Sequence, residues 1–264
     1  MFLEPIDFAH MYRKHKAATD FKSKSSSDWD EKSSDMAQST INSPYVEEFI
    51  SRMKLHGDET VLDIGCGPGA LSVPLAKKTK HVIAVDFSRK MLDEVEAYAA
   101  REGITNITTY HLGWEDDWSV LPPVDVAVAS RSMEVADLDA ALSKMSAHAA
   151  KACYLTYKVG GSFVDMDILG YIGKQVKTKP DYWYIPILLY GRGYLPRIDY
   201  IETGRGSVRS GTEEEFVQSL IWSIGSLDEE QQNKAREYYN RIVLGENRPP
   251  RPVRWAFIGW ETTK

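Results

Sequence analysis

The 264-residue chain has few of the residues that form disulfides or bind metal ions. Two cysteines, Cys66 and Cys153, are too few for a disulfide framework or a cysteine metal site. The six histidines show no metal-ligand spacing, so the sequence predicts no metal centre. No apolar run reaches the roughly 20 residues of a membrane span, and the first residues lack the basic start and apolar core of a secretory signal. We therefore expect a soluble cytoplasmic protein with no membrane partner.

Basic residues are also too few to give the chain a positive charge. There are 32 Lys and Arg against 38 Asp and Glu, for a formal net charge of −6. Proteins that bind nucleic acids neutralise phosphates with clustered Lys and Arg, and no such tract stands out. Hydrophobic residues make up 43% of the chain, enough for an ordinary globular core. The sequence thus indicates no clear nucleic-acid surface, and it leaves the oligomeric state open.

Four regions differ in composition and pattern. Residues 1–40 are polar and rich in Ser, Lys and Asp, which predicts a flexible N-terminal arm or lid. Residues 41–160 alternate strand and helix patterns and are expected to form an α/β core that binds a ligand. Residues 161–210 are rich in aromatic residues and are interpreted as an inserted cap over the ligand face. Residues 211–264 are expected to complete the sheet and its helices.

Strand and helix signals follow one another strictly after residue 60. Strands are expected at 60–64, 81–87, 107–112, 124–130, 151–159, 197–203 and 253–262. Helices are expected before and between them, with Ser43 and Pro44 starting the one before the first strand and a Thr212–Glu215 capping box starting another. This alternation predicts a doubly wound, mostly parallel seven-stranded sheet with helices on both faces.

A glycine-rich turn, "DIGCGPGA" at residues 63–70, follows the first expected strand. Glycines there permit positive φ and let a ligand lie against bare backbone. Gly65, Gly67 and Ala70 fit the G-x-G-x-x-G/A dinucleotide fingerprint, and Asp86 follows about 20 residues on, the offset of an acid that binds a ribose hydroxyl. An NAD(P)-dependent oxidoreductase is therefore one interpretation of this turn.

Asp63 argues for a different ligand. At 4 Å from a pyrophosphate charge, its carboxylate would cost about 4 kcal/mol at an effective dielectric of 20. The same carboxylate would attract an ammonium group. S-adenosylmethionine carries an adenosine for Asp86, an α-ammonium for the neighbourhood of Asp63, and no phosphate. It fits the two acids of this sequence better than a dinucleotide does.

The run "VLDIGCGPG", followed by "VIAVDFS" with its acid, resembles the class I S-adenosylmethionine-dependent methyltransferases. The resemblance covers residues 44–159 and implies a Rossmann-like methyltransferase fold with S-adenosylmethionine as cofactor. It implies that the turn wraps the methionine part of the cofactor with Asp63, Gly65, Cys66, Gly67 and Gly69.

The resemblance also assigns residues to the rest of the cofactor. Asp86 matches the acid that binds both ribose hydroxyls, and Phe87 and Met91 match positions that line the adenine. Trp114 and Glu115 occupy the adenine-recognition turn after the third strand, although Gly113 stands where the family has an acid. Ser130 and Arg131, after the fourth strand, match the segment beneath the transferable methyl group.

The acceptor side is less defined by the sequence. Glu134, Tyr184 and Tyr190 are the candidate substrate-binding residues, and no catalytic residue is identified. We expect methyl transfer to a small molecule. A methyltransferase of RNA or protein stays open, although "SRSM" replaces the N/D-P-P-Y motif of many nucleic-acid enzymes. An oxidoreductase and a non-catalytic cofactor-binding protein are the remaining alternatives.

Overall fold

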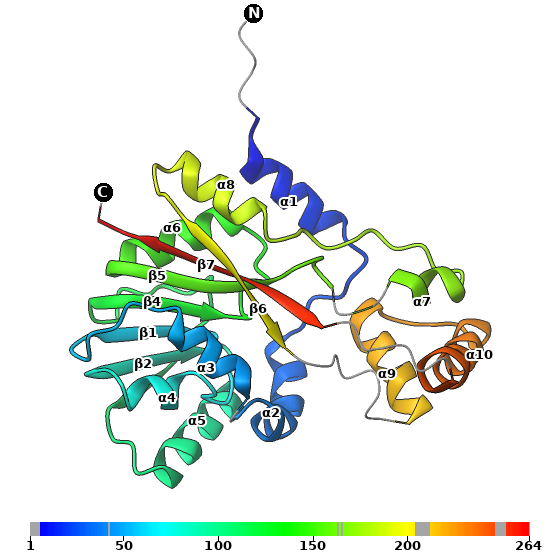
Figure 1. The fold of residues 1–264 in the computed structure, drawn as a ribbon, viewed down its shortest axis with the longest axis horizontal. Coiled ribbons are helices and arrows are strands. Elements are labelled where there is room, and N and C mark those ends of the chain that lie inside the picture. The colour runs from blue at the N-terminus through cyan, green and yellow to red at the C-terminus, as the bar shows by residue number, and fades with distance from the viewer. Residues whose placement is uncertain are drawn as a thin grey trace, which may run out of the picture.

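The computed structural model describes residues 6–41, 43–162, 164, 166–203, 212–245 and 252–263. A seven-stranded sheet with the order β3-β2-β1-β4-β5-β7-β6 lies at its centre (Figure 1). The strands are β1 (Thr60–Ile64), β2 (His81–Asp86), β3 (Ile107–His111), β4 (Val124–Ser130), β5 (Ala149–Lys158), β6 (Arg197–Thr203) and β7 (Val253–Glu261). β1 to β5 are parallel, and β7 pairs antiparallel with both β5 and β6. The mostly parallel seven-stranded sheet expected from the sequence is confirmed.

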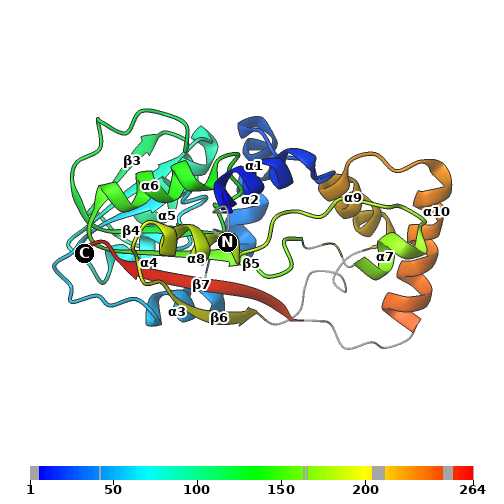
Figure 2. The same ribbon diagram turned by 90° about the horizontal axis from the view of Figure 1, so that it is seen from above.

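Helices cover both faces of the sheet (Figure 2). Leu62 and Ile64 pack into one apolar cluster with α1 (Phe8–Ala18), α6 (Leu138–His148) and α8 (Tyr184–Gly191). Val61, from the opposite side of β1, packs into a second cluster with α3 (Pro44–Ser51) and α4 (Ser72–Ala76), and α5 (Arg89–Arg101) contacts β2 and β3. Because both faces are covered, most residues of β1, β2, β4 and β5 are buried, and burial does not alternate along these strands.

Local capping explains where several helices begin. Ser43 is the N-cap of α3 and Pro44 its first residue, as the sequence predicted. Thr212 and Glu215 form the expected capping box of α9 (Glu213–Ile224). The Ser88 hydroxyl accepts a bond from the Met91 amide and caps α5 directly after β2. The Ser43 and Thr212 caps could be predicted because each involves residues two or three positions apart.

The N-terminal residues differ from the flexible arm that their composition predicted. Residues 6–41 contain α1 and α2 (Ser26–Thr40), begun by Asp7 and by a Ser25–Asp28 capping box. Tyr12 and Phe21 are buried, and the Tyr12 hydroxyl donates to the Val135 carbonyl at 2.8 Å. Caps and two buried aromatic side chains therefore fold a segment whose many Ser, Lys and Asp residues suggested disorder.

The aromatic insertion is shorter than the predicted 161–210. β6 pairs with β7 at the sheet edge, so the segment inserted between β5 and β6 is 161–196, with α7 (Met166–Tyr171) and α8 inside it. Residues 204–211 lie outside the described part of the chain.

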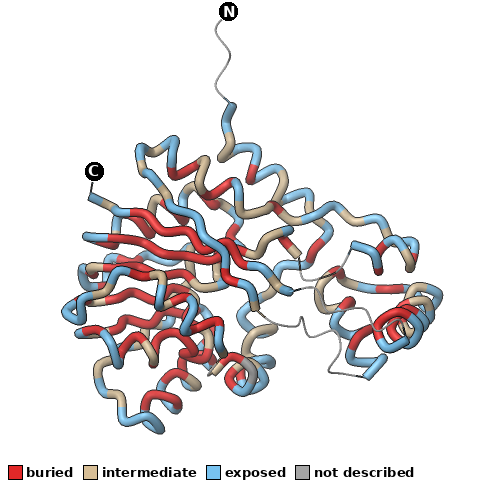
Figure 3. The backbone as a smooth tube through the Cα atoms, viewed as in Figure 1, coloured by how far each residue is buried: buried red, intermediate tan, exposed pale blue. Residues whose placement is uncertain are grey.

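A helical lobe stands apart from the sheet in Figures 1 and 2. It consists of α7, α9, α10 (Glu229–Tyr238) and the π-helix Tyr239–Gly245. These elements share an apolar cluster that also contains Phe21 from the N-terminal segment. The tube in Figure 3 shows separate buried stretches in the sheet and in this lobe.

Candidate functional site

The glycine turn follows β1 and lies between β2 and β4 at the carboxyl end of the sheet. Gly65, Gly67 and Gly69 all have positive φ, of 65°, 54° and 83°. A Cβ on Gly65 would lie 2.4 Å from the Cβ of Ser132, whereas a Cβ on Gly67 would meet no atom within 4 Å. Gly65 is thus required for packing, and the open space beside Gly67 leaves its backbone accessible to a ligand.

Asp63 lies under this turn, near the end of β1. Its side chain is buried, with 1% of the residue exposed, and Ser72 Oγ donates to its Oδ2 at 2.6 Å. Oδ1 has no hydrogen-bond partner among the described residues. The pKa of Asp63 is raised to about 7, mainly because the carboxyl group is buried; the bond from Ser72 lowers it, and nearby Asp86 raises it. A buried acceptor without a partner calls for a donor, ideally a positively charged one.

Asp86 is the last residue of β2 and anchors the turn through its side chain. Its Oδ2 accepts from the Gly67 amide at 2.8 Å, and its Oδ1 accepts from the Ser88 amide at 2.9 Å. Burial raises the pKa of Asp86, while these backbone bonds oppose the rise. Each carboxylate oxygen can accept a second hydrogen bond, so Asp86 can bind hydroxyl groups while it holds the turn in place.

Phe87, Trp114 and Glu115 surround the next part of the site. Phe87 keeps 39% of its surface exposed, although it is a large apolar residue. Trp114 Nε1 donates to the Ser132 carbonyl at 3.0 Å, which ties the turn after β3 to the turn after β4. Glu115 is exposed beside them. An exposed aromatic face next to Asp86, the acid expected to bind a ribose, suits a flat heterocycle.

Cys66 and Met91 are buried instead. The Cys66 side chain packs with Leu92 and Val95, and burial raises the pKa of its thiol. A protonated, buried thiol is a packing group, so Cys66 can contact a ligand only through its backbone. Met91 is 2% exposed in the first turn of α5, beneath the Ser88 cap.

Comparisons of the sequence and the fold with those of known proteins identify relatives of this chain. Residues 61–152 fit a family model described as a methyltransferase domain. A protein of Haemophilus influenzae, described as uncharacterized, is 33% identical over 268 residues, with the match covering all of both chains. The YcgJ protein of Bacillus subtilis has a similar fold, with a TM-score of 0.58 at 12% identity over 82% of this chain and 97% of that one.

The chain belongs to the class I S-adenosylmethionine-dependent methyltransferases.

Two further similarities concern methyltransferases with described substrates. Coclaurine N-methyltransferase, solved with N-methylheliamine and S-adenosylhomocysteine, has a TM-score of 0.54 at 13% identity over 97% of this chain and 94% of that one. The 23S rRNA (uracil(1939)-C(5))-methyltransferase RlmD of Vibrio parahaemolyticus is 36% identical over 78 residues. That match covers 30% of this chain and 18% of that protein, so the chain matches under a fifth of that relative.

S-adenosylmethionine is the cofactor of this methyltransferase, and the residues present fit it. The unpartnered Oδ1 of Asp63 suits the α-ammonium group, and the open backbone at Gly67 suits the methionine chain. Asp86 has acceptor capacity left for ribose hydroxyls, and Phe87 offers a ring face for the adenine. The glycine spacing alone left open whether the turn binds a dinucleotide or S-adenosylmethionine. The family and the fit of these residues decide for S-adenosylmethionine. The individual contacts stay predictions.

The carboxyl end of β4 forms the neighbouring part of the methyltransferase site. Ser130 Oγ lies 2.9 Å from the Tyr45 hydroxyl, which lies 2.5 Å from Thr156 Oγ1. The Arg131 amide donates to the same Thr156 oxygen at 3.1 Å. Ser132 Oγ donates back to the Ile64 carbonyl at 2.5 Å and so joins this segment to the glycine turn. A network across α3, β4 and β5 therefore fixes the residues that follow β4.

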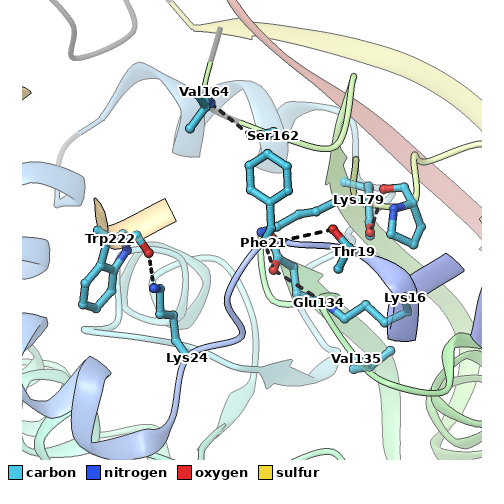
Figure 4. Close-up of polar contacts among 12 residues, drawn as sticks. Lys16, Thr19, Phe21, Lys24, Glu134, Val135, Ser162, Val164, Lys179 and Trp222 are labelled. Atoms are coloured by element: carbon cyan, nitrogen blue, oxygen red, sulfur yellow. Dashed lines mark hydrogen bonds and ion pairs between the residues drawn. The ribbon is translucent and has the colours of Figure 1, made fainter. Parts of the chain in front are cut away.

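Glu134 lies beyond β4, where α1 and the 161–196 insertion meet (Figure 4). Lys179 Nζ is 2.5 Å from Glu134 Oε1, and Lys16 Nζ is 3.8 Å from Oε2. The two lysine side chains are only 15% and 10% exposed. Burial lowers the pKa of Lys16, which Glu134 raises and Lys179 lowers. One carboxylate thus balances two largely buried ammonium groups from two separate segments.

The two predicted substrate-binding tyrosines lie on α8. Tyr184 is buried, with its ring 5.3 Å from that of Tyr12, and its hydroxyl lies 3.2 Å from His15 Nδ1. Tyr190 is 70% exposed near the end of the helix. Tyr184 thus packs α8 onto α1, and Tyr190 faces solvent. Their role in substrate binding stays a prediction.

Neither a metal centre nor a membrane helix is found in the described ranges. Within them, no group of three His, Cys, Asp or Glu side chains could hold a metal ion. No described helix is both long enough and apolar enough to span a bilayer.

Several residues of the site were not singled out from the sequence. Ser72 begins α4 and reaches back nine positions to Asp63, a spacing that a strand-turn-helix pattern can suggest. Tyr45 and Thr156 contact each other across 111 positions, and nothing in a single sequence signals that contact. Asp30 accepts a bond from the Ser88 hydroxyl and so brings α2 to the cofactor side of the site.

Proposed function

We propose that this methyltransferase transfers the methyl group of S-adenosylmethionine to a small-molecule acceptor. One observation carries the proposal: two segments outside the sheet cover the residues that follow β4. Tyr12 and Lys16 of α1 bind Val135 and Glu134, and Lys179 of the insertion binds Glu134 from another direction. An acceptor has to fit beneath these segments to reach the end of β4, which favours a small molecule over a folded RNA.

The extent of the similarities supports the same conclusion. Coclaurine N-methyltransferase, whose solved complex holds the small molecule N-methylheliamine, resembles this chain over 97% of its length. The matched rRNA methyltransferase shares only 30% of the chain. An RNA acceptor would also need a local basic surface on a protein whose net charge is −6.

The chain contributes binding, orientation and exclusion of water. The sulfonium of the cofactor supplies an activated methyl group for in-line transfer to a nucleophile of the acceptor. Asp63 and Asp86 hold the two ends of the cofactor, and the Ser130–Tyr45–Thr156 network sets the shape of the acceptor side. Alignment of two bound reactants in a dry site can provide much of the rate enhancement without a protein nucleophile.

Labelled methyl transfer tests this function. Purified protein and S-adenosylmethionine with a labelled methyl group are incubated with a cell extract separated into low-mass, RNA and protein fractions. We expect label in the low-mass fraction, and mass spectrometry then identifies the product. The Gly67→Ala variant serves as the control that should not transfer label. Label confined to RNA or to protein would contradict the proposal.

A further inference from the structure

Arg131, directly after β4, has three unusual properties. Its φ is 62°, and it is the one non-glycine residue with positive φ in the described part of the chain. Its guanidinium carbon lies 4.4 Å from the ring centre of Tyr45 and 5.9 Å from that of Trp255. The side chain is exposed, and no carboxylate of the described residues pairs with it. A strained backbone thus presents an immobilised, unpaired positive charge, a combination typical of binding sites.

The hydroxyl network next to Arg131 has a direction. The Arg131 amide donates to Thr156 Oγ1, so the Thr156 hydroxyl hydrogen needs another acceptor. Thr156 is fully buried, and the Tyr45 oxygen is the acceptor that the described residues provide. Leaving that hydrogen unpaired would be costly, so Thr156 donates to Tyr45 and Tyr45 donates to Ser130. The hydroxyl hydrogen of Ser130, which is only half-buried, is the one left over.

These two groups together make a site for an oxyanion. We propose that the Ser130 hydroxyl and the Arg131 guanidinium bind a carboxylate group of the methyl acceptor. A guanidinium matches the two oxygens of a carboxylate with a planar fork, and a hydroxyl adds a third donor. The rings of Tyr45 and Trp255 hold the fork in place beforehand, which reduces the entropy lost on binding. This assignment rests on the proposed small-molecule function.

The position of Arg131 favours a carboxylate of the acceptor over the cofactor's own carboxylate. The strand order across the sheet is β1, β4, β5, β7, and the glycine turn follows β1. Arg131 leans onto Trp255 of β7, on the far side of β5 from β4. With strands roughly 4.8 Å apart, the side chain extends from β4 toward β7, on the side of β4 opposite β1. The sequence predicted that Ser130 and Arg131 contact the cofactor. The experiment therefore distinguishes a carboxylate of the acceptor from the carboxylate of the cofactor.

Binding of two matched probes tests the proposal without knowledge of the acceptor. The protein is saturated with S-adenosylhomocysteine and titrated with 4-fluorobenzoate or with 4-fluorobenzamide, its neutral counterpart, by fluorine NMR. We expect the benzoate alone to bind with measurable affinity. Its affinity should fall about tenfold or more in Arg131→Gln and Arg131→Gly, because a charge-assisted bond is lost. Glycine tolerates the φ of 62°, so Arg131→Gly should fold at least as stably as the unchanged protein.

Arg101 provides the matched control. Its guanidinium carbon lies 4.8 Å from the Tyr98 ring at the end of α5, and Arg101→Gln should leave benzoate binding unchanged. Equal binding of the two probes, or full benzoate affinity in Arg131→Gln, would overturn the carboxylate site. A weaker affinity of Arg131→Gln for S-adenosylhomocysteine but not for methylthioadenosine, which lacks the carboxylate, would assign Arg131 to the cofactor instead. Methyl label found in RNA overturns the proposed function and the acceptor assignment, whichever probe binds.

Discussion

Ser72 donates a hydrogen bond to one carboxylate oxygen of Asp63 over 2.6 Å, and the other oxygen has no partner among the described residues. One serine cannot offset the burial of the whole carboxyl group, and the pKa of Asp63 rises to about 7. Within the described residues, the Asp63 carboxyl group is therefore incompletely paired in charge as well as in hydrogen bonding. A bound ammonium group would correct both, so we expect the titration of Asp63 to respond to the cofactor.

The stability of the ligand-free protein should fall as pH rises from the ordinary pKa of Asp63, 3.8, to its raised pKa of about 7. Between its ordinary pKa of 3.8 and the raised value of about 7, the folded state binds more protons than the unfolded state. The free energy of unfolding then decreases with rising pH, and this contribution to stability is lost above about 7. Thermal unfolding of the ligand-free protein across this range measures the slope. Asp63→Asn should flatten it, and an unchanged slope in that variant would assign the titration elsewhere.

Cofactor affinity should have the opposite pH dependence. The ammonium group prefers the ionised carboxylate, so S-adenosylhomocysteine should bind more tightly as pH rises toward about 7 and should release a proton from Asp63 on binding. The α-ammonium group itself begins to deprotonate near pH 8, which limits the gain above that value. Calorimetric titrations in buffers of different ionisation enthalpy count the released protons. The Asp63→Asn variant should release fewer protons on binding. An equal number of protons released by the variant and the unchanged protein would refute the pairing of Asp63 with the ammonium group.

Asp86→Asn should weaken S-adenosylhomocysteine binding by about 1–3 kcal/mol, because the amide replaces an acceptor for the ribose hydroxyls by a donor. It also loses a bond from the Gly67 or the Ser88 amide, so thermal unfolding is measured alongside. Asp93→Asn is the control, since Asp93 is exposed on α5 and pairs with Arg89. Undiminished affinity in Asp86→Asn would show that this acid does not bind the ribose.

Gly67→Ala and Gly103→Ala form a matched pair. Both glycines have positive φ, 54° and 67°, and an added Cβ meets nothing within 4 Å at either position. Each substitution should therefore cost about 1–2 kcal/mol of stability through backbone strain alone. Only Gly67→Ala should also abolish cofactor binding, because its methyl group fills the open side of the turn. Denaturant unfolding and calorimetry separate the two effects; equal cofactor affinities in both variants would contradict the proposed cofactor position.

Glu134→Gln should destabilise the protein by about 1 kcal/mol at neutral pH, since two lysines that are 10% and 15% exposed lose their shared anion. The loss should shrink at high pH, where Lys16, whose pKa is already lowered by burial, becomes neutral. Thermal unfolding at two pH values measures the difference. Glu261→Gln removes the exposed partner of Lys54 and should have little effect at either pH. A loss in Glu134→Gln that does not depend on pH would contradict the electrostatic explanation.

The parts of the structure that a sequence can reveal are those with local causes. The sequence predicted a ligand site from the strand that contains Asp63, the glycines after it and Asp86 at the end of the next strand, because these residues lie close together in the chain. The Ser43 and Thr212 caps were predicted for the same reason. The alternation of strand and helix patterns was enough to predict the sheet, because β1, β2, β4 and β5 are short segments of mostly buried side chains.

Long-range contacts explain what could not be predicted. Tyr12 bonds to Val135 across 123 positions, and this contact orders a segment whose composition suggested a flexible arm. The Tyr45–Thr156 bond likewise joins residues 111 positions apart. Tyr184 was singled out because it is aromatic, but the sequence did not reveal that its ring packs against Tyr12 of α1; its role in substrate binding stays a prediction. Residue type alone does not say which neighbour a side chain meets.

The placement of β7 between β5 and β6 has a consequence for biosynthesis. Thr203 bonds to Val253, 50 positions later, so β6 leaves the ribosome well before the strand it pairs with. Trp255, one wall beside Arg131, belongs to that late strand. A nascent chain can therefore assemble its glycine turn early, whereas the carboxylate site takes shape only when this edge of the sheet has closed.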